Sequence, residues 1–371
     1  MDVAQISLAK GATQENGESE MTDSRTSIIV GLVIGLLIGA GAMWVLNPGA
    51  GTSTQIYTIS TAGSTTVYPL SQEWATQFHA DLPSFTVNPS TGGSGLGQSQ
   101  IADGLIDVGA SSSYPDEDYR TDNPHVEIIP VSADALGIVA NPSVNGSTFK
   151  MDCDMAVAVF QRNVTSWEEF ETTFGVTIQQ TGDINIYVRS DASGTTATFA
   201  KWLEKADENT NPEGAEYEWG LGHSETISWI AGSNAVEGNP GVASGVDGDE
   251  NGIGYVGLAF MEGLTEVVLY NPGNEEWVEP TVANALKALP ETLSDPGANL
   301  MNSDRDGAYP IARLLFYMVN KNNLNWQTLT YLYWVLSIGQ QYIDDVGYVP
   351  IGGTSAMDYA MQAVGALAPS S

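Results

Sequence analysis

The chain contains very little of the side-chain types that build disulfides and many metal sites. It has one cysteine, Cys153, among 371 residues, so it has no intrachain disulfide framework. Its three histidines, His79, His125 and His223, are scattered, and their spacing matches no common metal-binding motif. We therefore predict no metal and no cofactor, and a buried packing role for the thiol of Cys153.

Basic residues are also scarce. The chain has 12 Lys and Arg against 45 Asp and Glu, which gives a formal net charge of −33 and a pI near 4.1. This balance excludes nucleic acid as a partner, because binding a phosphate backbone needs a footprint of Lys and Arg. We interpret the acidic surface as a solubility adaptation to salty surroundings, where salt screens repulsion between like charges. An anionic ligand would need a local group of donors inside a cleft.

The motifs of a hydrolase are missing as well. There is no G-x-S-x-G elbow and no His/Asp spacing typical of a catalytic metal cluster. Ser94 lies in the glycine-rich run G-G-S-G-L-G-Q, but no histidine is near it in the sequence. We predict that the protein is not an enzyme, and a phosphoesterase is the less favoured alternative.

The N-terminal part is predicted to cross a membrane. Residues 28–46 form an apolar run of 19 residues without a charge, which as a helix spans roughly 28 Å, enough for a bilayer core. Lys10 and Arg25 precede the run, and the next basic residue is Arg120. The positive-inside rule then places residues 1–27 in the cytoplasm, as a polar, disordered tail.

The apolar run has two interpretations. We predict a retained signal anchor in the lipid bilayer, because the run is long and a long tail precedes it. The alternative is a signal peptide that is cleaved near the small residues Gly39–Ala42. With the anchor retained, residues 47–54 form a short tether, and the remaining chain lies outside the cytoplasm.

Beyond the tether, strand-like runs alternate with helical patterns. Small-polar loops follow four of these runs, which are residues 56–60, 85–88, 106–110 and 184–188. This rhythm predicts an α/β fold with mostly parallel strands, whose ligand lies beyond the carboxyl ends of the strands. The apolar stretches Ala135–Ala140 and Gly252–Phe260 are predicted to cross between lobes. Tyr309–Ile338 is predicted to be rich in helix, with its aromatic residues in the core.

The segment Tyr187–Phe199, Y-V-R-S-D-A-S-G-T-T-A-T-F, carries the most informative chemical pattern. Arg189 ends an apolar strand, and the small residues S-G-T-T lead into a helical pattern. The first turn of a helix has N–H groups without intrahelical partners and the positive end of the helix dipole. Gly194 allows an anion to approach the backbone, and Arg189 adds a two-pronged cation. The segment is predicted to hold a small oxyanion, although a capped helix beside a surface arginine explains the same pattern.

Three further motifs accompany this segment in a defined order. They are A-G-S-T-T-V-Y-P at Ala62–Pro69, T-G-G-S-G-L-G-Q at Thr91–Gln98, and G-N-P-G-V-A followed by N-G-I-G-Y-V-G-L-A-F. With these motifs at these separations, the chain resembles the phosphate-binding proteins of ABC-type phosphate importers. The resemblance covers the chain from about Ile56 to about Ile351.

The resemblance implies a two-lobe periplasmic-binding-protein type II fold with two crossing strands, preceded here by the N-terminal transmembrane helix. The lobes of such proteins close on a dehydrated phosphate. On this basis we assign lobe I to residues 55–136 and 253–371, and lobe II to residues 137–252.

The resemblance also implies a role for each matching side chain. Thr65 and Thr66 correspond to a contact loop at a helix N-terminus, and Ser94 to a serine that donates from its hydroxyl and its backbone N–H. Arg189 corresponds to the arginine that pairs with the anion, and Asp191 to the carboxylate that orients this arginine. On its own, Asp191 is nearly as well explained as a turn residue. The second cradle at a helix N-terminus corresponds to Ser193, Gly194 and Thr195.

One position departs from the family pattern. Where many relatives have an aspartate that accepts the proton of phosphate, counting from Ser94 leads to Ser112. A carboxylate there rejects sulfate, which has no such proton, whereas a serine hydroxyl can donate or accept. Asp107 is predicted to face away from the site. Sulfate and arsenate therefore remain alternative ligands to phosphate.

Together, these features favour an extracytoplasmic, membrane-anchored solute-binding protein. The expected ligand is inorganic phosphate, and the expected partner is an ABC permease in the membrane. A surface sensor that kept the binding lobes is a further alternative, which the cytoplasmic tail of residues 1–27 permits.

Overall fold

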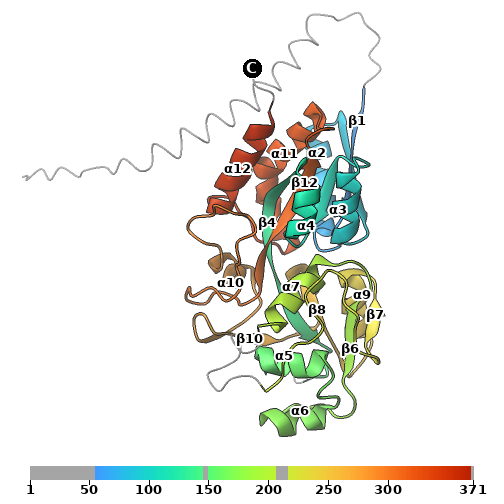
Figure 1. The fold of residues 1–371 in the computed structure, drawn as a ribbon, viewed down its shortest axis with the longest axis vertical. Coiled ribbons are helices and arrows are strands. Elements are labelled where there is room, and N and C mark those ends of the chain that lie inside the picture. Colours follow the sequence, from blue (N-terminus) through green and yellow to red (C-terminus); the bar gives the residue numbers. More distant parts are fainter. Residues whose placement is uncertain (1–54, 145–148, 206–215, 369–371) are drawn as a thin grey trace, which may run out of the picture. The chain divides into compact units, whose positions relative to one another are not determined.

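The computed structural model describes residues 55–144, 149–205 and 216–368. Within these residues a mixed sheet of nine strands forms the centre of the fold (Figure 1). Its strands are β1 (Tyr57–Gly63), β2 (Phe85–Thr91), β3 (Val108–Ser111), β4 (Val126–Ala140), β6 (Asn185–Arg189), β7 (Asn234–Val236), β8 (Gly252–Gly257), β9 (Thr265–Glu266) and β12 (Ala312–Asn320). Their order is β2-β1-β3-β12-β4-β8-β6-β7, and β9 pairs with β4 beside this path. A small second sheet contains β5 (Lys150–Met151), β10 (Val268–Asn271) and β11 (Glu276–Val278).

Strand β4 connects two halves of the large sheet. Its residues Val126–Ala135 pair with β12, and its residues Leu136–Ala140 pair with β8. We call β2, β1, β3, β12 and the first part of β4 the first half-sheet, and the second part of β4 with β8, β9, β6 and β7 the second half-sheet. Every β4 residue except Glu127 is buried, which fits a strand covered on both faces.

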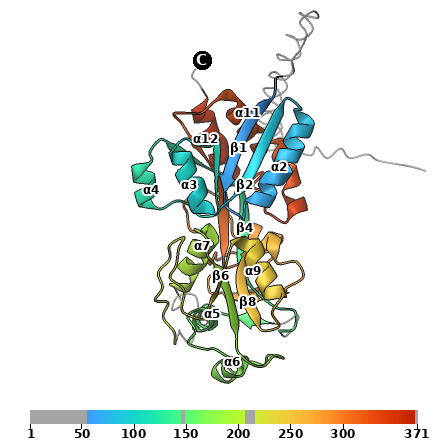
Figure 2. The same cartoon turned by 90° about the vertical axis from the view of Figure 1, so that its right-hand side faces the viewer.

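Helices follow the parallel strands of both half-sheets. The helices are α2 (Tyr68–Asp81), α3 (Ser94–Ala102), α4 (Glu117–Asp122), α5 (Cys153–Phe160), α6 (Trp167–Phe174), α7 (Gly194–Leu203), α9 (Gly238–Asp247), α10 (Val282–Lys287), α11 (Trp326–Leu336) and α12 (Ser355–Leu367), with short 3₁₀ turns η2 (Leu258–Phe260), η3 (Ile338–Tyr342) and η4 (Asp344–Val346). Helices α2 and α3 directly follow β1 and β2, and α7 and α9 directly follow β6 and β7. Figure 2 shows the first pair on one half-sheet and the second pair on the other. The predicted α/β rhythm is confirmed.

Aromatic side chains fill the core of each half. In the first half, Phe78 packs against Phe85, Tyr331 and Trp334 with ring centroids 5.1–5.4 Å apart. Cys153, in the second half, is fully buried, which confirms its predicted place in the core.

The segment Tyr309–Ile338 differs from its prediction. Residues Ala312–Asn320 form strand β12 in the middle of the sheet, and helix begins only at Trp326. All nine residues of β12 are buried, so the strand shows no alternation of polar and apolar residues. A short, wholly buried run of this kind cannot be distinguished from a buried helix by periodicity. The aromatic residues of the segment lie in the core, as predicted.

The second predicted crossing also lies elsewhere. Strand β8 stays in the second half-sheet, and the chain then forms β9, which pairs with the end of β4 at Val139 and Ala140. The chain returns to the first half-sheet where Ala312 pairs with Ala135. Strand pairing therefore groups β8 and β9 with the second half, although the sequence assigned residues 253–371 to the first lobe.

The predicted membrane anchor, residues 28–46, lies outside the described residues. Among the residues that the structure does describe, no helix has the length and apolar character needed to span a bilayer.

Candidate functional site

The N-terminus of α7 is built from the S-G-T-T motif. Ser193 has extended backbone and caps the helix, since its Oγ accepts a hydrogen bond from the backbone N–H of Thr196 at 3.1 Å. Its own N–H donates to the carbonyl of Glu225 at 2.9 Å, which fixes the loop before the helix. Gly194 and Thr195 then form the first turn, where N–H groups have no intrahelical acceptor. This turn presents donors and a positive dipole end toward the first half-sheet.

Arg189, the last residue of β6, points into the same region. Its side chain is 1% exposed and forms an ion pair with Asp191. The Nε atom donates to Asp191 Oδ1 at 2.7 Å, Nη2 donates to Asp191 Oδ2, and Nη2 also reaches Thr65 Oγ1 at 2.9 Å. Burial pushes the pKa of Asp191 up, but the hydrogen bonds and charge of Arg189 outweigh it and hold the pKa below its usual value. Asp191 also accepts from the N–H of Gly238, so it holds Arg189 from a fixed position.

The first half-sheet supplies hydroxyls to the same place. Ser94 Oγ lies 3.3 Å from Ser112 Oγ and accepts from the backbone N–H of Ser112 and of Gly194. Thr66 Oγ1 lies 2.8 Å from Thr195 Oγ1. The structure thus brings together side chains that are far apart in the sequence. They are the sequence-predicted residues Thr65, Thr66, Ser94, Ser112, Arg189, Asp191, Ser193, Gly194 and Thr195.

Two glycines allow the half-sheets to meet here. A Cβ on Gly194 would lie 2.6 Å from the backbone N of Ser113 and 2.7 Å from Ser112 Oγ. Gly93 has φ +86, and a Cβ there would lie 2.3 Å from the carbonyl oxygen of Ala192. Gly194 was predicted to let an anion approach the backbone. Its contacts show that it also admits Ser112 and Ser113, the two residues that follow β3.

Asp107 is remote from this cluster, as predicted. Its Oδ2 accepts from the backbone N–H of Ser60 at 2.8 Å and from the Ser60 hydroxyl at 2.7 Å. It therefore fixes neighbouring strands, and it does not face the hydroxyl cluster.

Sequence reasoning missed a buried ion pair beside the cluster. Arg313 on β12 donates from Nη2 to Asp134 Oδ2 on β4 at 2.8 Å, and its Nε lies 3.3 Å from the same oxygen. Arg313 Nη2 also reaches Thr195 Oγ1 at 3.1 Å and Thr66 Oγ1 at 3.4 Å. Burial raises the pKa of Asp134 and lowers that of Arg313, while each charge opposes the shift of the other. A lone charge within each of two apolar runs was the signal that could have found this pair.

Two other polar side chains complete the surroundings. Asn239, from the G-N-P-G motif, donates to Thr66 Oγ1 at 2.8 Å. Glu225 accepts from the Ser113 hydroxyl at 2.7 Å and from Gln98 Nε2 at 2.8 Å. Burial raises the pKa of Glu225. Glu225 belongs to the second half of the protein and its partners to the first, so it is a further contact between the halves.

Donors outnumber acceptors in this cluster. The Nη1 atoms of Arg189 and Arg313 are buried, and neither has a hydrogen-bond partner within the part of the chain that is described. An unpaired buried donor is costly, and a guanidinium group can accept no bond in return. The arrangement suits a small anion with several oxygen acceptors. The described residues contain no group of three His, Cys, Asp or Glu placed to hold a metal.

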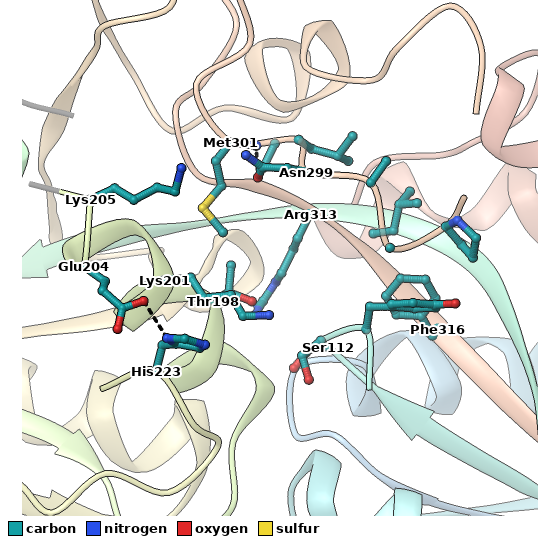
Figure 3. A pocket seen from close by; sticks show the side chains of 18 residues that line it. Ser112, Thr198, Lys201, Glu204, Lys205, His223, Asn299, Met301, Arg313 and Phe316 are labelled. Atoms are coloured by element: carbon teal, nitrogen blue, oxygen red, sulfur yellow. Dashed lines mark hydrogen bonds and ion pairs between the residues drawn. The ribbon is translucent and has the colours of Figure 1, made fainter. Parts of the chain in front are cut away.

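A pocket of about 440 Å³ adjoins the cluster. Figure 3 shows Arg313 reaching toward Thr198 at its base, with Glu204 and His223 on one side and Ser112 on the other. Lys201 and Lys205 also line it. The pocket therefore leads from Arg313 to a wall that contains two lysines, Lys201 and Lys205, beside Glu204.

Comparison with known proteins places this geometry in a family. The phosphate-binding protein PstS of Xylella fastidiosa is 26% identical over 317 residues, covering 82% of this chain and 84% of that protein. PstS of Haemophilus influenzae is 27% identical over 320 residues, covering 83% and 93%. The crystal structure of a phosphate-binding protein from Stenotrophomonas maltophilia matches with a TM-score of 0.60 at 15% identity, covering 82% of this chain and 93% of that one. The family model described as the PBP superfamily domain matches residues 48–338, so the chain belongs to the PBP superfamily.

Proposed function

We propose that this protein is an extracytoplasmic solute-binding protein that captures inorganic phosphate between its two half-sheets and delivers it to an ABC permease. One observation carries the proposal: a buried arginine and a helix N-terminus meet serine and threonine hydroxyls from the opposite half-sheet. Relatives that cover most of the chain are named phosphate-binding proteins, which supports the same ligand.

The proposed ligand contacts are those predicted from the sequence. The backbone of Gly194 and the hydroxyl of Thr195 would bind from the second half-sheet, together with Arg189. The hydroxyls of Thr65, Thr66, Ser94, Ser112 and Ser193 would add neutral donors. Because these groups are buried, their hydrogen bonds to an anion would be stronger than in water. Binding and release need no chemical step.

The two half-sheets would act as lobes. We propose that they move apart and together about the middle of β4, near Ala135, where its pairing changes from β12 to β8. We keep residues 137–252 as the body of lobe II and residues 55–136 in lobe I. Hinge closure of this kind buries a ligand and adds contacts from both sides.

We propose that residues 28–46 anchor the protein in the cell membrane, with the binding part outside the cytoplasm. The apolar run without charge and the basic residues before it support this orientation. An anchored binding protein would remain close to its permease.

Titration calorimetry of the full-length protein in detergent micelles tests the proposal. We expect phosphate to bind, and we expect Arg189→Gln to weaken binding about 100-fold, because a buried anion loses its cation. Lys321→Gln is the control, since Lys321 is 40% exposed and pairs with Glu127 away from the site. If phosphate does not bind, or if Arg189→Gln binds within a few-fold of the unchanged protein, the proposal is wrong.

A further inference from the structure

We propose that Arg313 is a second anion-facing cation, and that the site therefore selects tetrahedral oxyanions by their double negative charge and accepts sulfate as well as the phosphate dianion. This inference rests on the proposed function and deepens it, because it concerns the ligand class of the same site.

Arg313 keeps hydrogen-bond donors that its ion pair does not use. Its side chain is 6% exposed and that of Asp134 is fully buried. A guanidinium group has five N–H donors, and both contacts with Asp134 go to one oxygen, Oδ2. Nη1 has no partner among the residues described. Asp134 therefore neutralises the charge of Arg313 without occupying all of its donors.

The guanidinium group of Arg313 lies beside the proposed anion-binding residues. Nη2 of Arg313 reaches the hydroxyl oxygens of Thr66 and Thr195, one from each half-sheet. Arg189 reaches Thr65, the neighbour of Thr66, and the charge of Arg189 contributes to lowering the pKa of Arg313. The two guanidinium groups therefore approach neighbouring threonines, Thr65 and Thr66, from two different strands.

Hydrogen-bond donors are in excess at Thr66. Its Oγ1 is contacted by Nη2 of Arg313, by Nδ2 of Asn239 and by the hydroxyl of Thr195. One hydroxyl oxygen cannot satisfy these groups together with the unpaired Nη1 atoms of two arginines. A tetrahedral anion without a proton has four oxygens, and all four can only accept hydrogen bonds.

The carboxylates around the proposed anion-binding residues already have hydrogen-bond partners. Asp134 bonds Arg313, Asp191 bonds Arg189, and Glu225 bonds Ser113 and Gln98. The remaining position, Ser112, offers a hydroxyl, which can donate to an oxygen that has no proton. In the part of the chain described, no carboxylate is placed to require a proton on the ligand.

The test compares phosphate with sulfate at several pH values, using the full-length protein in detergent micelles. Sulfate is a dianion throughout, whereas phosphate becomes one only above its second ionisation. Both ligands experience the same protein titration, so the ratio of their affinities reports the ligand charge. A change in the protonation of a group near Arg313 affects both affinities and therefore cancels in their ratio. The charged and titratable groups concerned are Asp134, Arg189, Asp191, Lys201, Glu204, Lys205, His223, Glu225 and Tyr348.

We expect sulfate to bind within about tenfold of phosphate above the second ionisation. Below it, phosphate affinity should fall in proportion to the dianion fraction, because only that fraction is competent to bind. If sulfate neither binds nor competes, or if the ratio does not change with pH, the inference is overturned.

A paired variant tests Arg313 itself. Arg313→Gln alone leaves Asp134 as a buried, unpaired charge, so we use Arg313→Gln together with Asp134→Asn, which keeps the pair neutral. We expect both anions to bind at least about 30-fold more weakly. The matched control is Lys321→Gln together with Glu127→Gln. Glu127 lies on β4 and Lys321 just beyond β12, and Lys321 Nζ is 3.3 Å from Glu127 Oε2. This control should leave both affinities unchanged.

The outcomes separate the inference from the proposed function. If phosphate binds, sulfate does not, and the paired variant binds normally, the inference fails while phosphate capture stands. If neither anion binds the unchanged protein, the proposed function fails and the inference fails with it. A paired variant that melts at the same temperature but has lost both anions supports Arg313 as an anion contact.

Discussion

Arg189 and Asp191 show how far single residues can be predicted. The resemblance to the phosphate-binding proteins implied that Asp191 orients Arg189, whereas the residues alone fit a turn position for Asp191 nearly as well. The structure contains that pair, with Arg189 Nε 2.7 Å from Asp191 Oδ1. Arg313 and Asp134 form a similar pair, but they are 179 residues apart. No local spacing connects them, so only the sheet, which places β12 beside β4, could reveal their contact.

Asp191 provides a pH-dependent prediction at the residue scale. Its folded-state pKa is held below the usual value, so its contribution to stability is present above the unfolded pKa of about 3.9 and is lost as pH falls through the folded value. Asp191→Asn should cost about 1–2 kcal/mol near neutral pH and weaken phosphate binding about tenfold, because Arg189 loses its charged partner. Thermal melting against pH and calorimetry measure the two effects.

The difference in stability between Asp191→Asn and the unchanged protein should disappear in acid. Asp304→Asn, at an exposed position, serves as the control and should melt like the unchanged protein at every pH. A constant difference across the whole pH range would show that Asp191 acts through packing and not through its charge.

At the scale of elements, the repeated strand-loop-helix units were predictable because each unit is local. The polar loop after β1 and the S-G-T-T turn after β6 each carry site residues and lead into a helix. Strand β12 was not predictable in this way, because its environment is provided by β3 and β4, which are distant in sequence. Burial on both faces removed the alternation that identifies a strand.

The contact between the start of α7 and the residues just after β3 gives a prediction for Gly194. A Cβ there would lie 2.6 Å from the backbone N of Ser113, and backbone cannot move aside as a flexible side chain can. Gly194→Ala should keep the half-sheets apart and weaken phosphate binding about tenfold or more. Titration calorimetry measures this loss.

Gly365→Ala is the control for Gly194→Ala. Gly365 lies in α12, and a Cβ there would meet nothing within 4 Å. This change should leave binding unaltered and stabilise the helix by up to about 1 kcal/mol. Unchanged phosphate affinity in Gly194→Ala would contradict the close approach of the two half-sheets during binding.

At the scale of the whole molecule, an anion must reach its site on a chain with a net charge of −33. The long-range field of such a protein repels anions, whereas the pocket beside the site carries Lys201 and Lys205 in its wall. These lysines can raise the local concentration of an anion near Arg313. Their effect belongs to the association rate, because exposed charges act mainly on diffusional encounter.

Removing both lysines tests this role. Lys201→Gln with Lys205→Gln should slow phosphate association several-fold at low salt and leave dissociation nearly unchanged. High salt should remove the difference, since screening weakens exposed charges first. Stopped-flow tryptophan fluorescence measures both rates, with Lys321→Gln as the control. A change in the dissociation rate alone would mean that the lysines hold the bound anion instead.

Strand β4 also bears on how the protein unfolds. A single strand of 15 residues belongs to both half-sheets, and all but one of its residues are buried. If β4 leaves the sheet of one half, the strand is also disturbed in the other half, where apolar surface and backbone amides become exposed. Amide protons along the whole strand should therefore exchange with solvent only through opening of the entire molecule, and not through separate openings of each half. In that sense the two halves would form one cooperative folding unit, even where they move as two lobes in the proposed closure.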